Sequence, residues 1–319
     1  MDQVTEEIAL KGYRFPAFGG EVTVEASGSE AEALLKAAAA RVTEVSQALT
    51  RFDPTSELSR INADRRARVE ASPLMIRFVE TAIEAAGMTD GLVDPTLLPE
   101  LESAGYSRSM SGNGTDHWTP GIARAESDTE DGASGPALGD RWGTISVEPG
   151  NGTLNRGPGV RLDAGGIGKG LASDLVAEMM EDSKVEAWSV DCLGDVRIGG
   201  TAGEIRPVTI GSPFPGGDPI EVLEIRNAGV ATSGTTRRTW TNTDGTTAHH
   251  LIDPRTGLPA EGNLVQVTAI APTTVEAEAR AKAALLSGLD QVERWLPHGG
   301  LIVDMDGKVH RFGYLQEAV

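Results

Sequence analysis

Hydrophobic residues alternate with polar ones in some stretches of the chain and recur every three to four residues in others. The alternation over residues 20–27 predicts a strand, and the longer period over residues 29–52 predicts a helix. Ser29 and Glu32 have the spacing of a capping box, so we expect them to close the start of that helix. The side chains predicted to share its buried face are Leu34, Ala38, Val42, Val45 and Leu49.

Three further helices are predicted by the same periodicity. They cover residues 72–87, 170–182 and 273–288. Ser72 followed by Pro73 is typical of a helix start, and Gly87 is expected at the end of that helix. Thr273 and Glu276 form a second potential capping box.

Strand patterns dominate the second half of the chain. A hairpin is expected around residues 150–152, and another at Asp306-Gly307, a pair that suits a type I′ turn. Four more strand candidates are residues 186–200, 204–212, 221–234 and 264–272. Because strands and helices do not alternate regularly, the order expected of a doubly wound parallel sheet is missing, and the fold class is predicted to be α+β.

The length and composition predict one domain over residues 1–319, with a division into two subdomains as the alternative. Residues 107–140 are rich in Ser, Gly, Asp and Pro and hold few large apolar residues. We therefore expect residues 107–140 to form a flexible surface insertion and not a further domain.

The formal charge of −19 changes which partners can be expected. Nucleic acid and anionic membranes would both be repelled over most of such a surface, so neither is a predicted partner. The chain has no apolar window of membrane-spanning length and no signal-like apolar run near its start, so we expect a cytoplasmic location. A ligand that carries phosphate would have to be bound by local donors and cations.

The stretch LDAGGIGKG, residues 162–170, offers such donors. It fits neither of the two common phosphate-loop spacings, since Asp163 stands where the first glycine belongs. A glycine-rich turn that opens a helix nevertheless presents backbone N–H groups, and Lys169 adds a positive charge. We predict a phosphate site here.

Five polar motifs follow one another along the chain, each at the expected end of an element. Taken singly, each is compatible with an ordinary turn. They are RFDPTSELSRIN, TDGLVDPT, RLDAGGIGKG, ATSGTTRR and HHLIDPRTG. In this order and at these separations, the set over residues 18–288 resembles the ApbE family of FAD:protein FMN transferases. CLGDVRIGG resembles the family's Gly-Gly-Asp turn only in part, because Leu193 replaces its first glycine.

The resemblance implies a T-fold-related α+β architecture, with largely antiparallel sheets flanked by helices. It implies an enzyme that moves FMN from FAD to a Ser or Thr hydroxyl of an acceptor protein and releases AMP. By position, His250 would be the base that activates this hydroxyl, and a base with a near-neutral pKa suits that role. The residues implied to bind FAD are Asn62, Asp94, Thr96, Asp163, Lys169, Thr232, Ser233, Gly234, His250, Asp253, Arg255 and Thr256.

The resemblance also implies magnesium, but one part of the motif differs. The ligands would be the carbonyl of Gly166 and, on the late helix, an Asp and a Thr, where this chain has Glu278 and Lys282. A carboxylate can still ligate magnesium and a protonated lysine cannot, so we expect Lys282 to replace the metal in part and to act in catalysis. The alternative is a Glu278–Lys282 pair on a solvated helix face.

A second departure follows the ATSG motif. Relatives usually carry an acidic and then an aromatic residue there, whereas this chain has Thr235 and Thr236 and then two cations, Arg237 and Arg238. These departures leave two alternatives to the transferase open. One is an enzyme that hydrolyses FAD to FMN and AMP, and the other is a non-catalytic FAD-binding protein.

Overall fold

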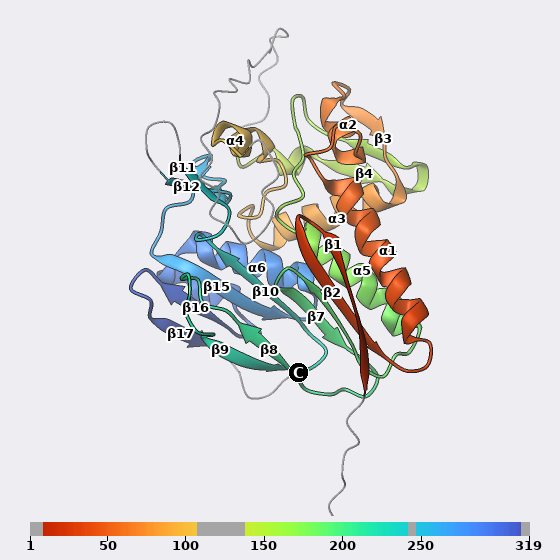
Figure 1. Ribbon diagram of the computed structural model, residues 1–319. Helices are drawn as coiled ribbons and strands as arrows, with labels where there is room; N and C mark the ends of the chain where they lie inside the picture. The colour runs from red at the N-terminus through yellow and green to blue at the C-terminus, as the bar shows by residue number, and fades with distance from the viewer. Residues whose placement is uncertain (1–8, 107–137, 242–246, 314–319) are drawn as a thin grey trace, which may run out of the picture.

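An eight-stranded sheet forms the centre of the computed structural model, which describes residues 9–106, 138–241 and 247–313 (Figure 1). Its order is β1-β2-β6-β7-β10-β15-β16-β17, and every pairing in it is antiparallel. The α+β prediction is therefore confirmed. The strands are β1 (Leu10–Ala17), β2 (Gly20–Ser27), β6 (Trp188–Cys192), β7 (Asp195–Gly199), β10 (Gly229–Gly234), β15 (Leu264–Ala271), β16 (Gly300–Asp304) and β17 (Val309–Phe312).

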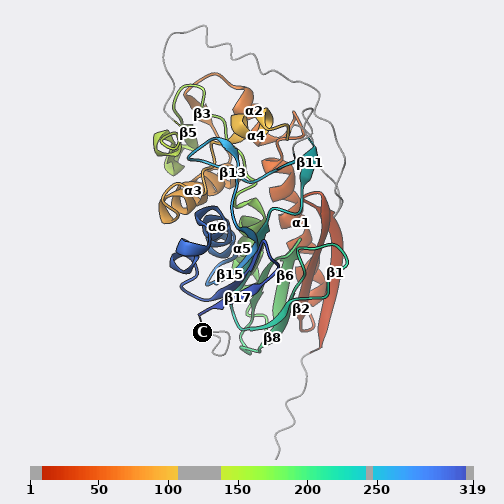
Figure 2. The ribbon, with the colours of Figure 1, turned by 90° about the vertical axis from the view of Figure 1, so that its left-hand side faces the viewer.

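Three helices cover one face of this sheet (Figure 2). Helix α1 (Ala31–Leu49) packs on β1 and β2, α5 (Gly168–Asp182) on β6 and β7, and α6 (Thr274–Ser287) on β10 and β15. The hairpin of β8 (Arg206–Ile210) and β9 (Glu221–Ile225) buries its apolar side against Ile198, Val230 and Leu301 of the sheet. None of the helices in the described ranges is both long and apolar enough to cross a membrane.

Smaller elements gather at one end of the sheet, the top in Figure 1. The helical ones are α2 (Glu57–Ala63), α3 (Pro73–Met88) and α4 (Leu98–Ser103), with the 3₁₀ turns η1 (Trp142–Thr144) next to α3 and η2 (Pro149–Asn151) between β4 and β5. The 3₁₀ segment η3 (Leu289–Trp295) instead packs on α6. The strands are β3 (Arg68–Glu70), β4 (Ser146–Glu148) and β5 (Thr153–Asn155), then β11 (Thr239–Thr241), β12 (Thr247–His249), β13 (Ile252–Asp253) and β14 (Leu258–Pro259). The predicted hairpin at residues 150–152 is confirmed as β4 and β5.

The helix predictions hold, with differences at their ends. Helix α1 buries Leu35 in place of the expected Leu34, and the capping box at its start is wrong: Glu30 precedes the helix without a side-chain hydrogen bond. Ser72 accepts a hydrogen bond from Met75 N at the start of α3, as its sequence predicts. That helix runs one residue past Gly87. Thr273 caps α6 through Glu276 N.

Two strand predictions were incomplete. Residues 186–200 form two strands, β6 and β7, because Leu193 and Gly194 both have positive φ and make a tight turn between them. Residues 221–234 divide in the same way, into β9 and β10. The predicted type I′ turn at residues 306–307 is wrong: of the two residues only Gly307 has positive φ, and its N–H bonds Asp304 O.

The insertion predicted at residues 107–140 lies outside the described residues except for 138–140, which form a turn. The prediction of one domain over residues 1–319 stays a prediction.

Helices α5 and α6 cross in close contact at Gly170. A Cβ atom at Gly170 would lie 2.9 Å from Val275 Cα and 3.0 Å from Glu278 Oε2. Gly170 N also donates a hydrogen bond to Glu278 Oε2 over 3.0 Å. This crossing therefore has no room for a larger residue.

We expect Gly170→Ala to lower the free energy of unfolding by about 1–3 kcal/mol, because the added methyl group overpacks the crossing. Urea denaturation measures this change. Gly87→Ala is the matched control: it lies in α3 with nothing within 4 Å of an added Cβ, so it should be neutral or stabilising by up to about 1 kcal/mol. Equal stability of the two variants would contradict the close crossing.

Candidate functional site

Two adjoining cavities lie above the ends of α5 and α6. The smaller has a volume of about 230 Å³ and the larger about 790 Å³. Four residues with basic side chains line both cavities, and we call the place where the cavities meet the basic junction. These residues are Lys169, Arg238, His250 and Lys282.

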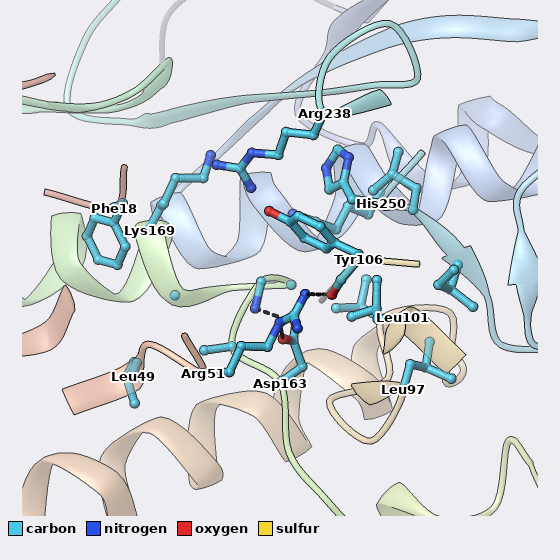
Figure 3. A pocket seen from close by; sticks show the side chains of 18 of the residues that line it. Phe18, Leu49, Arg51, Leu97, Leu101, Tyr106, Asp163, Lys169, Arg238 and His250 are labelled. Carbon is cyan, nitrogen blue, oxygen red and sulfur yellow. Dashed lines mark hydrogen bonds and ion pairs between the residues drawn. The ribbon is translucent and has the colours of Figure 1, made fainter. Parts of the chain in front are cut away.

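The smaller cavity has mainly apolar and aromatic walls (Figure 3). Tyr106 contributes to them from beyond the end of α4, with its ring stacked on Trp240 at 5.5 Å between centroids. Leucines of α1 and α4 complete the wall, so the cavity suits a flat, apolar ring system. They are Leu49, Leu97 and Leu101.

Arg51 ties three segments together beneath this cavity. Its Nε lies 3.1 Å from Asp163 Oδ1, and its Nη2 donates to Tyr106 O over 2.6 Å. The guanidinium also lies over the rings of Phe52 and Tyr106, at 4.3 and 4.6 Å from their centroids. Neither Arg51 nor Tyr106 was among the predicted site residues, although Arg51 is the first residue of the motif RFDPTSELSRIN. Its place in that motif was the available signal.

The larger cavity is more polar and receives the end of β10. Thr232, Ser233 and Gly234, all predicted site residues, line it. Thr232 Oγ1 lies 2.8 Å from Thr268 Oγ1 on the neighbouring strand, and Ser233 is buried. The structure therefore brings this motif to the cavity wall.

A buried charge cluster joins the two helices at the junction. Lys169 forms an ion pair with Asp195, and its Nζ lies 4.0 Å from Glu278 Oε1. Lys282 Nζ lies 3.0 Å from the same carboxylate oxygen. Burial opposes the charge of Lys169, but Asp195 and Glu278 outweigh it and raise the pKa of its ammonium. Asp195 was not among the predicted site residues.

His250 faces this junction from the loop after β12. Its Nδ1 is buried and has no hydrogen-bond partner among the described residues, and the ring lies edge-on to Tyr106 at 6.4 Å. Burial holds the pKa of His250 well below its ordinary value of 6.5, and nearby positive charges lower it further. The charges are those of Arg238, His249, Lys282 and Lys169. His250 is therefore a neutral imidazole near pH 7.

His249 has a different environment from its neighbour. Its Nε2 lies 2.9 Å from Ala260 O, and its Nδ1 accepts a hydrogen bond from Leu251 N at 3.3 Å. Both ring nitrogens are thus used within the loop. The geometry favours His250 as the base and His249 as a structural residue.

Asp94 reaches the smaller cavity with one oxygen unused. Thr96 donates to Oδ1 from both its N–H and its hydroxyl, at 2.7 and 2.6 Å, while Oδ2 is buried without a partner. Burial raises the pKa of the Asp94 carboxyl, and this effect outweighs the hydrogen bonds from Thr96, which lower the pKa. A buried acceptor without a partner is what a ligand donor would satisfy.

Five of the predicted site residues line neither cavity. The hydrogen bonds of four of these five are made to backbone groups or to another of the five residues. Asn62 exchanges two hydrogen bonds of 2.7 Å with the backbone of Leu162, next to Asp163. The Arg255 guanidinium makes a bidentate hydrogen bond to the Asp253 carboxylate and donates a further hydrogen bond to Leu286 O. The five are Asn62, Thr96, Asp253, Arg255 and Thr256.

Magnesium binding by the two predicted ligands, Gly166 and Glu278, stays a prediction. Gly166 lines the smaller cavity and Glu278 the larger. Within the ranges that the structure describes, no group of three His, Cys, Asp or Glu residues could bind a metal ion. Both Glu278 oxygens are engaged, one by Gly170 N and one by Lys282.

The alternative of a solvated Glu278–Lys282 pair is wrong. The pair exists, but its side chains are only 2% and 12% exposed. Lys282 lines both cavities, so its ammonium faces the site.

The chain resembles known proteins over most of its length. The profile of the ApbE family matches residues 18–303. A FAD:protein FMN transferase of Escherichia coli K12 is 28% identical over 264 residues, which are 81% of this chain and 72% of that protein. One of Klebsiella pneumoniae strain 342 is 27% identical over 302 residues, 93% of this chain and 83% of that protein.

Solved structures show the same fold. The ApbE protein of Thermotoga maritima has a TM-score of 0.77 and 25% identity, and the match covers 95% of this chain and 97% of that one. The flavin transferase ApbE of Vibrio cholerae has a TM-score of 0.73 over 98% of this chain and 100% of that one; at 19% identity it supports the fold alone. Because the family profile spans most of the sequence, this chain belongs to the ApbE family.

Proposed function

We propose that this chain is a FAD:protein FMN transferase, the activity for which its relatives are named. The observation that carries the proposal is the convergence of the glycine-rich block, the ATSG strand and the His250 loop around two joined cavities. A fold alone does not determine an activity, but this arrangement of groups suits one.

FAD has two flat ring systems joined by a pyrophosphate, and the two cavities offer matching surfaces. The smaller supplies apolar walls and the Tyr106 ring for one ring system. The junction supplies Lys169, Arg238 and Lys282 for the pyrophosphate. The unused Asp94 Oδ2 can accept a hydrogen bond from the ligand.

The proposed reaction is the transfer of a phosphoryl group. The acceptor hydroxyl oxygen forms a bond to the phosphorus on the FMN side, the bridging P–O bond breaks, and AMP leaves. His250, neutral because of its lowered pKa, takes the hydroxyl proton on a ring nitrogen. The nearby cations offset the negative charge that develops on the phosphate oxygens.

Magnesium belongs to the activity that the family resemblance implies, and the described residues do not fit it well. Both oxygens of Glu278 are already bonded, one to Gly170 N and the other to Lys282. The acceptor is proposed to be a protein with an exposed Ser or Thr, which would enter by the larger, more polar cavity.

Purified protein should bind FAD with a dissociation constant of about a micromolar or tighter, roughly −8 kcal/mol. Equilibrium dialysis measures the binding, and co-expression with candidate acceptor proteins followed by intact-mass analysis detects the added FMN. AMP should appear only with an acceptor. Release of AMP without any acceptor would favour the hydrolase, and FAD binding without AMP the binding protein.

Replacement of His250 by Ala should leave FAD affinity nearly unchanged and lower kcat by about 10²–10⁴-fold, because a positioned base acts chiefly in the transition state. Single-turnover AMP release measures the loss. His249→Ala is the matched control and should have a milder effect, since its nitrogens bond within the loop. A His250→Ala variant with the wild-type rate would exclude this role.

The pH profile of kcat/KM should have its acid limb below pH 6.5. Burial lowers the pKa of His250 in the free protein, so the imidazole remains an available base until the pH falls through that lowered value. The free energy of unfolding should also decrease as the pH is lowered from 6.5 to the pKa of His250 in the folded protein. In that range the unfolded chain binds a proton that the folded chain does not. An acid limb above 6.5 would point to another base.

A further inference from the structure

Arg238 is the cation at the junction that the family motifs do not explain. It lies between β10 and β11, lines both cavities, and has a φ of +52°. Residues with a Cβ atom rarely adopt this left-handed conformation, and such backbone is found preferentially at functional sites. Figure 3 shows its guanidinium beside the ammonium of Lys169, with the His250 ring next to it.

The charges around Arg238 do not neutralise it. Lys169 and Lys282 are matched by the two carboxylates Asp195 and Glu278. Among the described residues, Arg238 has no hydrogen bond or ion pair to any carboxylate. Of the cations Lys169, Lys282 and Arg238, Arg238 is therefore the one without a paired carboxylate among the described residues, in a protein whose formal net charge is −19.

The glycine-rich block supplies fewer free donors than its sequence predicts. Four of its N–H groups donate within the protein: Gly165 to Asp163, Ile167 and Gly168 to Ala164, and Gly170 to Glu278. A phosphate at this helix start would thus meet few unused backbone groups. Side-chain cations must carry a larger share of the binding.

We propose that Arg238 binds the pyrophosphate of FAD directly, and that Lys282 occupies the place of a divalent metal, so that the ligand binds without one. The inference rests on the proposed function for the identity of the ligand. A guanidinium suits this role because its planar fork donates two parallel hydrogen bonds to phosphate oxygens. The ammonium of Lys282 and a magnesium ion would compete for the same oxygen of Glu278.

Calorimetric titration with inorganic pyrophosphate in EDTA tests the proposal on the full chain. Wild-type protein should bind it, and Arg238→Gln should bind about tenfold more weakly or worse, since a hydrogen bond to a charged group is lost. Arg238→Lys keeps the charge without the fork and should lie between the two. Arg226→Gln is the matched control: Arg226 is exposed and lines neither cavity, so this variant should bind as wild type does.

Thermal unfolding of each variant establishes that it is folded before titration. No binding by the wild type in EDTA would overturn the proposal. So would equal affinities of Arg238→Gln and Arg226→Gln.

Magnesium titrations test the role of Lys282 separately. Magnesium alone should give no binding heat with wild type, whereas Lys282→Thr should bind pyrophosphate more weakly in EDTA and recover with added magnesium. Identical metal dependence of the two proteins would overturn this part.

The flavin-transfer assay separates this inference from the proposed function. Transfer that occurs only with magnesium would retain the function and overturn the inference. Metal-free pyrophosphate binding through Arg238 without any use of FAD would support the phosphate site and overturn the transferase.

Discussion

At the start of each of the helices α5 and α6, backbone N–H groups donate hydrogen bonds to a carboxylate of the other helix. The position of the site depends on these bonds. Asp174 of α5 accepts hydrogen bonds from Thr274 N and Val275 N at the start of α6, at 2.8 and 2.9 Å. Glu278 of α6 accepts one from Gly170 N at the start of α5. A carboxylate at a helix start meets unpaired N–H groups and the positive end of the helix dipole. The crossing fixes where Lys169 and Lys282 emerge, and the glycine at its centre keeps the two close.

The second constraint is a series of contacts between side chains from distant parts of the sequence. Arg51 joins the end of α1 to Asp163 and to the backbone of Tyr106. Tyr106 in turn stacks on Trp240, whose indole donates to Ala104 O. The small apolar cavity is enclosed by these long-range contacts.

Local patterns predicted the elements better than they predicted the site. The period of Val42, Val45 and Leu49 was sufficient for α1, because one buried face determines a helix. The capping box at Ser29 failed because the chain enters α1 at Glu30, a local choice that spacing does not determine. Asp94, Lys169 and His250 could be assigned to the site through ordered motifs. The role of Arg51, although it opens the first motif, and that of Tyr106 could not, since the two residues are 55 positions apart in sequence and their contact depends on tertiary packing.

The loop that carries His250 is bonded almost wholly to itself. Thr256 N and Gly257 N donate hydrogen bonds to Asp253 O, and Ala260 N donates one to Leu251 O. The guanidinium of Arg255 donates to the Asp253 carboxylate through two of its nitrogens. The conformational entropy of the loop is therefore lost when the protein folds and not when a ligand arrives. Affinity at this site should reflect direct contacts with little penalty for ordering the loop, and the imidazole should be preorganised in the empty protein.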